Sequence, residues 1–323
     1  MRTGCAKDCG PGMMHRFKHN FVPVISVVTV IMLLWYAFAV NLNKNWAVDK
    51  ATRGGYDLTF TELVADTWTQ KNPRLPTPDQ VGLEIWNSTY GVAAKVWQKK
   101  ADKGFWQRLH LSMTNKKNLA YHTWVTFSAT MLGFLFGTGL GVFLAVGIVH
   151  NKAMNNSVMP WVITSQTIPI LALAPMLILL LNAAGITGIV PKAFIAAYLS
   201  FFPVVVGMVK GLRSPDAMQM DLMRTWSADK IQTFWRLRLP SSVPFLFPSL
   251  KVGVAASLVG AIVAELTISQ DGGLGARILQ SNYYGMTLKI WSALIAAATL
   301  AACLVALAGL ADRKISKRMG FRA

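Results

Sequence analysis

Charged residues are scarce in this chain of 323 residues. They make up 14% of it, while 53% of its residues are hydrophobic; an ordinary soluble domain has about 25% charged residues. The charges gather at the ends of long apolar runs and form no basic face. The net charge of +18 is therefore a poor indication of nucleic-acid binding. The distribution is typical of a polytopic membrane protein.

Cysteine is also rare, and its placement argues against a zinc site. The chain has three cysteines, Cys5, Cys9 and Cys303. Only five residues separate Cys9 from His15, whereas a zinc finger needs about twelve between its cysteine and histidine pairs. We therefore expect no metal site. Cys303 lies in an apolar run, and we expect it to be a packing residue.

Signatures of catalysis and of nucleotide binding are missing as well. There is no G-x-x-x-x-G-K-[ST] phosphate loop, so we expect this chain to bind no ATP and no other cofactor. The stretch DGGLG, residues 271–275, follows no strand, and we interpret it as a tight turn. His110, His122 and His150 are far apart in sequence, and placement at the membrane interface explains each. The chain is not expected to be an enzyme.

The sequence has instead six apolar runs, each long enough to cross a bilayer, which takes about 20 residues per helix. This predicts an all-α polytopic membrane protein. A cleavable signal peptide is the alternative for the first run, but that run is longer than a signal core, and we expect an uncleaved anchor. The predicted spans are 21–40, 121–149, 159–182, 191–212, 243–266 and 288–311.

Lysine and arginine counts predict the orientation of the spans. With the N-terminus in the cytoplasm, the inner segments 1–20, 150–158, 213–242 and 312–323 hold 15 basic residues. The two short outer segments hold only Arg277. We therefore expect both termini in the cytoplasm, with a cytoplasmic tail over 1–20, a first anchor over 21–40 and a basic tail over 312–323. A five-span core, 121–311, would contain the cytoplasmic loop 213–242.

A long outer segment, 41–120, separates the first span from this core. Its stretch NPRLPTPDQ is rich in proline and is expected to be extended. The following stretch places Val81, Ile85, Val92 and Val96 at helical intervals, with basic residues after them. Two interpretations remain open for this helix: an amphipathic helix on the outer membrane surface, or a helix packed on the other spans.

The polar segment DLMRTWSADKIQTFWRLRLP, residues 221–240, lies between the fourth and fifth spans. Its apolar residues recur at helical spacing on both sides of a polar break at 227–229. This predicts a short helix, a turn and a second helix that stops at Pro240. Such an amphipathic pair can lie in the lipid interface, pack under its own bundle or fit a groove on a partner.

The spacing of this segment resembles a signature found in permease subunits of binding-protein-dependent ABC importers. That signature reads Glu-Ala-Ala, three residues, Gly, nine residues, Ile, one residue, Leu-Pro. Asp221 takes the Glu place, Ser227 the Gly place and Leu237 the Ile place, and Leu239-Pro240 match outright. Ser227 in place of glycine predicts a turn that needs no positive φ.

The resemblance covers roughly residues 75 to 315. The segments LPTPDQV, QTIPILALAPMLILLL, FFPVVVGMVKGLRSP, PSSVPFLFPSLKVGVAASLVGAIVAEL and GGLGARIL are similar to those of the nitrate, sulfonate and taurine type of these permeases. The resemblance implies a bacterial inner-membrane subunit that forms the path of a small solute, either an anion or a small heterocycle. It also implies partner ATPase subunits that use ATP, a periplasmic binding protein, a second permease chain and surrounding lipid.

In that family the cytoplasmic loop is a coupling helix that sits in a groove of the ATPase subunit. Trp226 and Trp235 would be its aromatic anchors, and neighbouring arginines would pair at the rim. The coupling residues expected by this resemblance are Asp221, Leu222, Met223, Trp226, Ser227, Phe234, Trp235, Leu237, Leu239 and Pro240.

Polar residues inside the spans are candidates for the translocation path. Ser165, Gln166 and Thr167 precede Pro169, where a bend would free backbone carbonyls. They line the path or satisfy that backbone. Glu265, near the outer end of the fifth span, lines the path, reaches the outer interface or pairs with Arg277. Gly133, Gly137 and Gly141 share one face of the second span and predict close helix packing.

Three other functions are alternatives to the importer. An ion-coupled secondary transporter needs broken helices in corresponding halves and buried acids near the membrane centre, and Glu265 has no counterpart. A membrane-embedded enzyme needs clustered histidines or acids at one membrane face, which the inner loops do not offer. A structural anchor has no need for spans with so many polar residues and prolines.

Overall fold

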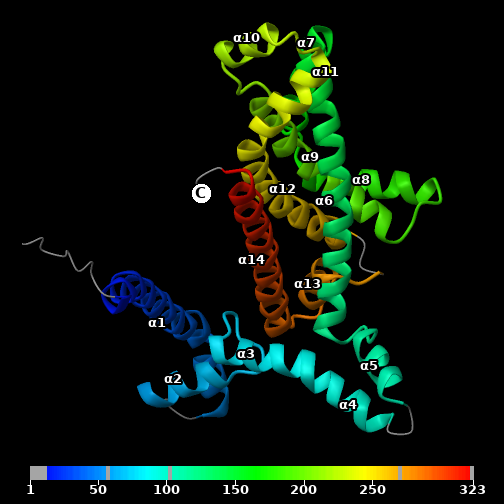
Figure 1. The fold of residues 1–323 in the computed structure, drawn as a ribbon. Coiled ribbons are helices and arrows are strands. Elements are labelled where there is room, and N and C mark those ends of the chain that lie inside the picture. The colour runs from blue at the N-terminus through cyan, green and yellow to red at the C-terminus, as the bar shows by residue number, and fades with distance from the viewer. Residues whose placement is uncertain (1–12, 56–58, 101–103, 268–270, 321–323) are drawn as a thin grey trace, which may run out of the picture. The chain divides into compact units, whose positions relative to one another are not determined.

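The computed structural model describes residues 13–55, 59–100, 104–267 and 271–320, and every element in these ranges is helical (Figure 1). This confirms the all-α expectation. The cysteines Cys5 and Cys9 lie outside the described residues. The α-helices and two π-helical turns are α1 (Met13–Gly54), α2 (Phe60–Thr69), α3 (Pro78–Trp86), η1 (Asn87–Gly91), α4 (Val92–Lys99), α5 (Phe105–Met113), α6 (Leu119–His150), α7 (Lys152–Ser165), α8 (Ile170–Ala183), α9 (Ile189–Leu212), α10 (Ala217–Thr225), α11 (Lys230–Thr233), η2 (Phe234–Arg238), α12 (Leu239–Thr267), α13 (Leu274–Tyr283) and α14 (Thr287–Arg318).

Five of the described helical segments are long and apolar enough to cross a membrane, and a sixth candidate is the pair α7 and α8. This pair bends by 102° at a break of no more than four residues. The sequence predicted a bend within one span over 159–182, whereas here the helix ends and restarts. Pro169 is the N-cap of α8, and a residue before proline disfavours helical geometry, which favours the end of α7 before Ile168.

The chain divides into two compact units, residues 1–84 and 85–323. In the first, α1 continues well past the predicted end of the first span at residue 40. Buried Asn43 ties the proline-rich loop to α1: its Nδ2 donates to Leu75 O at 2.8 Å, and its Oδ1 accepts from the Arg74 N–H at 2.8 Å. The prediction of an extended stretch over NPRLPTPDQ is wrong for its last three residues, because α3 already begins at Pro78. Residues 71–77 form an irregular loop with bends.

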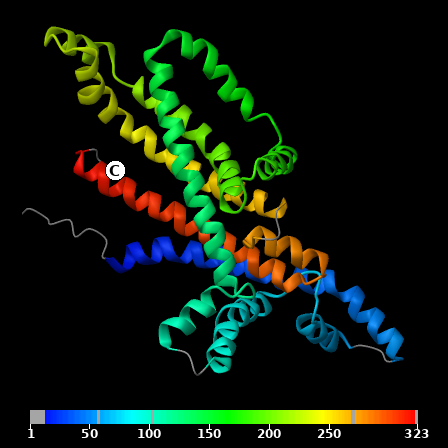
Figure 2. The same cartoon turned by 90° about the vertical axis from the view of Figure 1, so that its right-hand side faces the viewer.

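The core of the second unit is built from α6, α9 and α12, which run side by side (Figures 1 and 2). Small residues let these helices approach closely. A Cβ added to Gly133, Gly137 or Gly141 of α6 would overlap with atoms of α9, which confirms the predicted packing face. Gly260 of α12 also lies close to α9, against the backbone of Ala196.

The predicted environments of Cys303 and His122 need correction. Cys303 is exposed on the chain and not packed inside it, because it lies on a face of α14 that no described helix covers. His122 is buried, where interface placement was expected. Its Nδ1 accepts from the Gly273 N–H at 3.1 Å, which leaves Nε2 to donate to Lys116 O at 2.9 Å.

Candidate functional site

The polar loop begins with α10, whose N-terminus is closed by a capping box. The Asp216 side chain accepts from the third residue of the helix, and the Asp216 N–H donates to Gln219 Oε1 at 3.1 Å. The helix ends in a Schellman motif: the Ser227 N–H donates to Arg224 O at 2.9 Å, and the Ala228 N–H donates to Met223 O at 3.0 Å.

Ser227 occupies the left-handed position of this motif, with a φ of 53°. The prediction that a serine here indicates a turn without positive φ is therefore wrong. A Schellman motif requires the left-handed conformation at this position whatever the residue, and glycine adopts it at the lowest cost. The loop therefore forms the same turn with serine as it would with glycine. The difference is that serine adopts the left-handed conformation at a higher free energy.

The second half of the loop does not stop at Pro240, contrary to the prediction. The helix begins at Lys230 and continues to Thr267. Its N-cap is Asp229, whose carboxylate accepts from the Gln232 N–H at 2.6 Å. The turn η2 lies just before the proline, and there the Leu239 N–H donates to Phe234 O, five residues back. This wider turn relieves the clash between a proline ring and the preceding turn, so the helix passes through Pro240.

The ten predicted coupling residues divide into two faces. One face is half-buried against the bundle: Phe234 and Leu239 pack on a core cluster of α6, α7 and α9. The Phe234 ring centroid lies 5.2 Å from that of His150. The half-buried residues are Met223, Phe234, Leu237, Leu239 and Pro240.

The other face is exposed and carries large apolar side chains. Trp226 is 68% exposed, Trp235 63% and Leu222 48%, and Ile231 lies exposed between the two tryptophans in sequence. Asp221 and Arg224 form an exposed ion pair of 3.0 Å, which contributes little to stability. The segment is therefore fixed to the bundle on one side and presents an aromatic surface with charged neighbours on the other. The exposed residues of the predicted set are Asp221, Leu222, Trp226, Ser227 and Trp235.

The predicted path residues Ser165, Gln166 and Thr167 lie at the break between α7 and α8. Gln166 and Thr167 are exposed, and Ser165 is half-buried. The Tyr198 hydroxyl of α9 donates a hydrogen bond to the Ser165 carbonyl, a group without an intrahelical partner at the end of α7. The break therefore brings polar side chains to the surface between α7 and the apolar helix α8.

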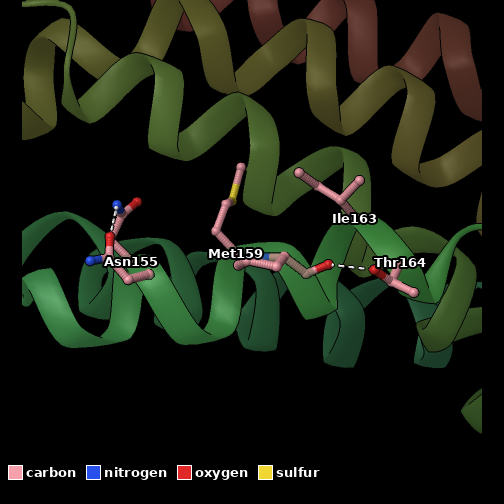
Figure 3. A pocket seen from close by; sticks show the side chains of 6 residues that line it. Asn155, Met159, Ile163 and Thr164 are labelled. Atoms are coloured by element: carbon pink, nitrogen blue, oxygen red, sulfur yellow. Dashed lines mark hydrogen bonds between the residues drawn. The ribbon is translucent and has the colours of Figure 1, made fainter.

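A groove of about 550 Å³ follows one face of α7 toward this break (Figure 3). Its lining mixes amide, hydroxyl and apolar groups and includes no charged side chain. Asn155 Nδ2 donates to Asn156 Oδ1 at 3.1 Å, and Thr164 Oγ1 donates to the Pro160 carbonyl at 2.8 Å. Sequence reasoning missed these residues because Asn155 and Asn156 fall in the predicted inner segment 150–158, and uncharged polar residues there or in the span 159–182 carry little signal. The lining residues are Asn155, Asn156, Met159, Pro160, Ile163 and Thr164.

Glu265, predicted as a further path residue, is fully enclosed in the chain, with 0% exposure. Its carboxylate accepts from Thr126 Oγ1 at 2.8 Å and from the Gly275 N–H at 3.0 Å. Lys192 lies in the same buried region and donates to Gly272 O at 3.0 Å. The structure thus places Glu265 where it joins α6 and α12 to the start of α13.

The DGGLG stretch forms the other half of this buried contact. Gly272 and Gly273 have φ values of 75° and 119°, which confirms the predicted tight turn. A Cβ at Gly273 would overlap with the Glu265 carboxylate, and one at Gly275 with the carbonyl of Ile262. Only glycine permits this approach, which explains the glycine-rich composition without a bound phosphate. In the described ranges, no three His, Cys, Asp or Glu side chains lie together as a metal site would need.

Comparison with known proteins places this architecture in a family. Residues 137–320 match the family described as the binding-protein-dependent transport system inner membrane component. A formylaminopyrimidine transport permease protein of Halalkalibacterium halodurans is 30% identical over 165 residues, which cover 51% of this chain and 64% of the relative.

Two further relatives are named for different solutes. A riboflavin transport system permease protein of Chloroflexus aurantiacus is 28% identical over 222 residues, or 69% of this chain and 76% of the relative. A nitrate import permease protein of Synechocystis is 25% identical over 172 residues, or 53% of this chain and 60% of the relative. The matched family region contains the polar loop and the break between α7 and α8. The chain therefore belongs to the family of inner-membrane components of binding-protein-dependent transport systems and is the membrane-spanning permease subunit of an ABC importer.

Proposed function

We propose that α10, α11 and η2 form the cytoplasmic surface on which a separate ATP-hydrolysing subunit docks. The observation that carries this proposal is the division of the loop into two faces. Phe234 and Leu239 attach it to the core, while Trp226 and Trp235 remain exposed. Exposed tryptophans at the centre of an apolar face are the residues that most often dominate binding energy at protein interfaces.

The continuity of α11, η2 and α12 gives the docked subunit a means of moving the spans. A displacement of Trp235 passes into a helix that runs unbroken to Thr267. The half-buried contacts of Phe234 on the core would carry the same displacement toward α6 and α9. Closure of the ATPase subunits would in this way change which side of the membrane the path opens to.

We place the translocation path beside the break between α7 and α8, with Gln166 and Thr167 exposed there. The groove on α7 supports this placement, since its lining offers hydrogen-bonding amides and no charge. Glu265 is enclosed by its partners. We therefore assign it the role of fixing the start of α13, and not that of lining the path. The path would be completed by a second copy of this chain, and both termini would be cytoplasmic.

The solute that best suits this lining is a small heterocycle delivered by a periplasmic binding protein. Uncharged amide and hydroxyl groups can pair with the ring nitrogens and carbonyls of such a solute without repelling it. Two of the relatives described above are named for formylaminopyrimidine and riboflavin. A small anion, as in the nitrate relative, is the alternative class.

Copurification from detergent-solubilised membranes tests the docking proposal. We expect an ATPase to copurify with the wild-type chain and to be lost from the double variant Trp226→Ala, Trp235→Ala. Trp106→Ala is the control, because Trp106 is also largely exposed, at 79%, but lies on α5. If no ATPase accompanies an intact wild-type chain, the docking proposal fails, and ion-coupled transport becomes the function to test.

A further inference from the structure

The outer segment contains a helical hairpin, α4 and α5, that the transport function leaves without a role. Its two helices are joined by aromatic contacts: Trp97 and Phe105 meet edge to face with ring centroids 5.4 Å apart. Arg108 lies over the Trp97 ring, 6.0 Å from its centroid. Only residues 114–118 separate α5 from Leu119, the first residue of the membrane-spanning helix α6. The hairpin is therefore held close to the membrane surface.

Each helix of the hairpin has an apolar and a polar side. In α4, Lys95 and Lys99 are exposed, and Val96 and Trp97 are half-buried. In α5, Trp106 and Met113 are seven residues apart and share one face, on which they are 79% and 59% exposed. This apolar face is covered by no described part of the second unit, and it lies beside the point where the chain enters the membrane.

The charge of this region is strongly positive. Residues 92–118 contain seven lysines and arginines and a single acid, Asp102. Lys116 and Lys117 are exposed immediately before α6. A basic side beside an exposed aromatic ridge is the composition of helices that lie in the membrane interface and bind anionic headgroups.

An apolar groove of about 490 Å³ lies along the start of α6, the helix that follows the hairpin in the chain. Thr89 of η1, Trp124 and Phe127 of α6 and Leu300 of α14 contribute to its wall. Trp124 is exposed and stands against Phe127, with ring centroids 5.5 Å apart. An acyl chain fits such a lining, whereas the neighbouring lysines suit the phosphate of the same molecule.

We propose that the α4–α5 hairpin lies on the membrane surface at the end of the bundle opposite the polar loop and binds anionic phospholipid there. Trp106 and Met113 enter the interface, and Lys95, Lys99, Lys116 and Lys117 face the headgroups. A soluble acidic protein would match the charge but would leave Trp106, Met113 and the groove without an apolar environment. The proposal does not depend on docking of an ATPase.

Spin labels on the full chain in nanodiscs test this placement. Cys5, Cys9 and Cys303 are first replaced by serine, and one label is then placed at Met113→Cys or at Gln107→Cys. Gln107 is the matched control, because it is exposed on the same helix but on a different face. We expect the Met113 label to be accessible to oxygen and protected from a nickel chelate, and the Gln107 label to show the reverse.

Lipid composition separates binding of headgroups from apolar insertion alone. Protection at Met113 should be greater in an equal mixture of phosphatidylcholine and phosphatidylglycerol than in pure phosphatidylcholine. Each basic residue near an anionic surface contributes about 1 kcal/mol, roughly a fivefold change in an equilibrium constant. The double variant Lys95→Gln, Lys99→Gln should therefore lower the equilibrium constant for binding the anionic surface by about 25-fold, and the extra protection of Met113 should fall accordingly.

Three results would overturn the proposal. Equal exposure of both labels to the chelate in all nanodiscs would place the hairpin in water. Equal protection with and without phosphatidylglycerol would remove the headgroup specificity. Protection of Met113 only after addition of a soluble protein would assign this face to a protein partner.

Discussion

Ser227 holds a left-handed backbone conformation that costs a non-glycine residue roughly 1–2 kcal/mol. Ser227→Gly should remove much of this cost, and Ser227→Ala should retain it, because alanine has the same Cβ. We expect the amides of Ser227 and Ala228, which close the end of α10, to exchange hydrogen about five- to tenfold more slowly in the glycine variant. Hydrogen-exchange mass spectrometry measures this. Equal exchange in the glycine and alanine variants would contradict the assignment of strain to this position.

Glu265 illustrates what sequence can and cannot predict about a single residue. Its charge inside an apolar span marked it as important, and that signal came from the residue itself. Its partners did not follow, because Thr126 is 139 positions away and a threonine in a span is unremarkable. The glycines of the 271–275 stretch predicted a tight turn, but nothing in the sequence indicated that this turn approaches the Glu265 carboxylate.

At the scale of elements, α6 provides a matched pair of glycines that tests how its packing face works. A Cβ at Gly137 would overlap with Ser200 Oγ and approach the Ala197 carbonyl, whereas one at Gly139 meets nothing within 4 Å. Gly137→Ala should therefore destabilise the chain by about 1–3 kcal/mol through overpacking. Gly139→Ala should be neutral or stabilise it by up to about 1 kcal/mol, because alanine favours the helix.

Thermal unfolding of both variants in the same detergent measures this difference. The expected order of midpoint temperatures is Gly137→Ala below wild type, with Gly139→Ala at or above it. A Gly137→Ala variant as stable as wild type would mean that α6 and α9 can separate slightly at no cost. The close approach of the two helices would then not be a requirement of the fold.

The elements differ in how well hydropathy predicted them. Length and apolar content identified the candidate spans, because a bilayer demands both from any helix that crosses it. The helix boundaries were predicted less accurately. For example, α1 continues beyond residue 40 into polar sequence, where hydropathy does not indicate the end of a helix. The helix end predicted at Pro240 was wrong because the π-helical turn before it accommodates the proline ring, and this turn has no signature in the sequence. Pro169 correctly marked a bend, but local sequence does not set its 102° angle.

At the scale of the whole molecule, the exposed face of the loop combines two kinds of contact that respond differently to salt. Trp226 is an apolar anchor, and Arg236 is an exposed charge beside Trp235. Trp226→Ala should weaken binding of the ATPase by at least about 30-fold, the effect of losing about 2 kcal/mol at a hot spot. This loss should be the same at low and high ionic strength, because burial of apolar surface is not screened.

Arg236→Gln should behave in the opposite way. An exposed rim charge contributes at most about 1 kcal/mol, so binding should weaken no more than about fivefold at low salt. The difference from wild type should disappear at high salt, where the Debye length falls to about 3 Å at 1 M. Titration of the copurifying ATPase onto each variant at two salt concentrations measures both effects. If Arg236→Gln lost as much affinity as Trp226→Ala at every salt concentration, the arginine would be buried in the complex, and η2 would lie at the centre of the docking surface.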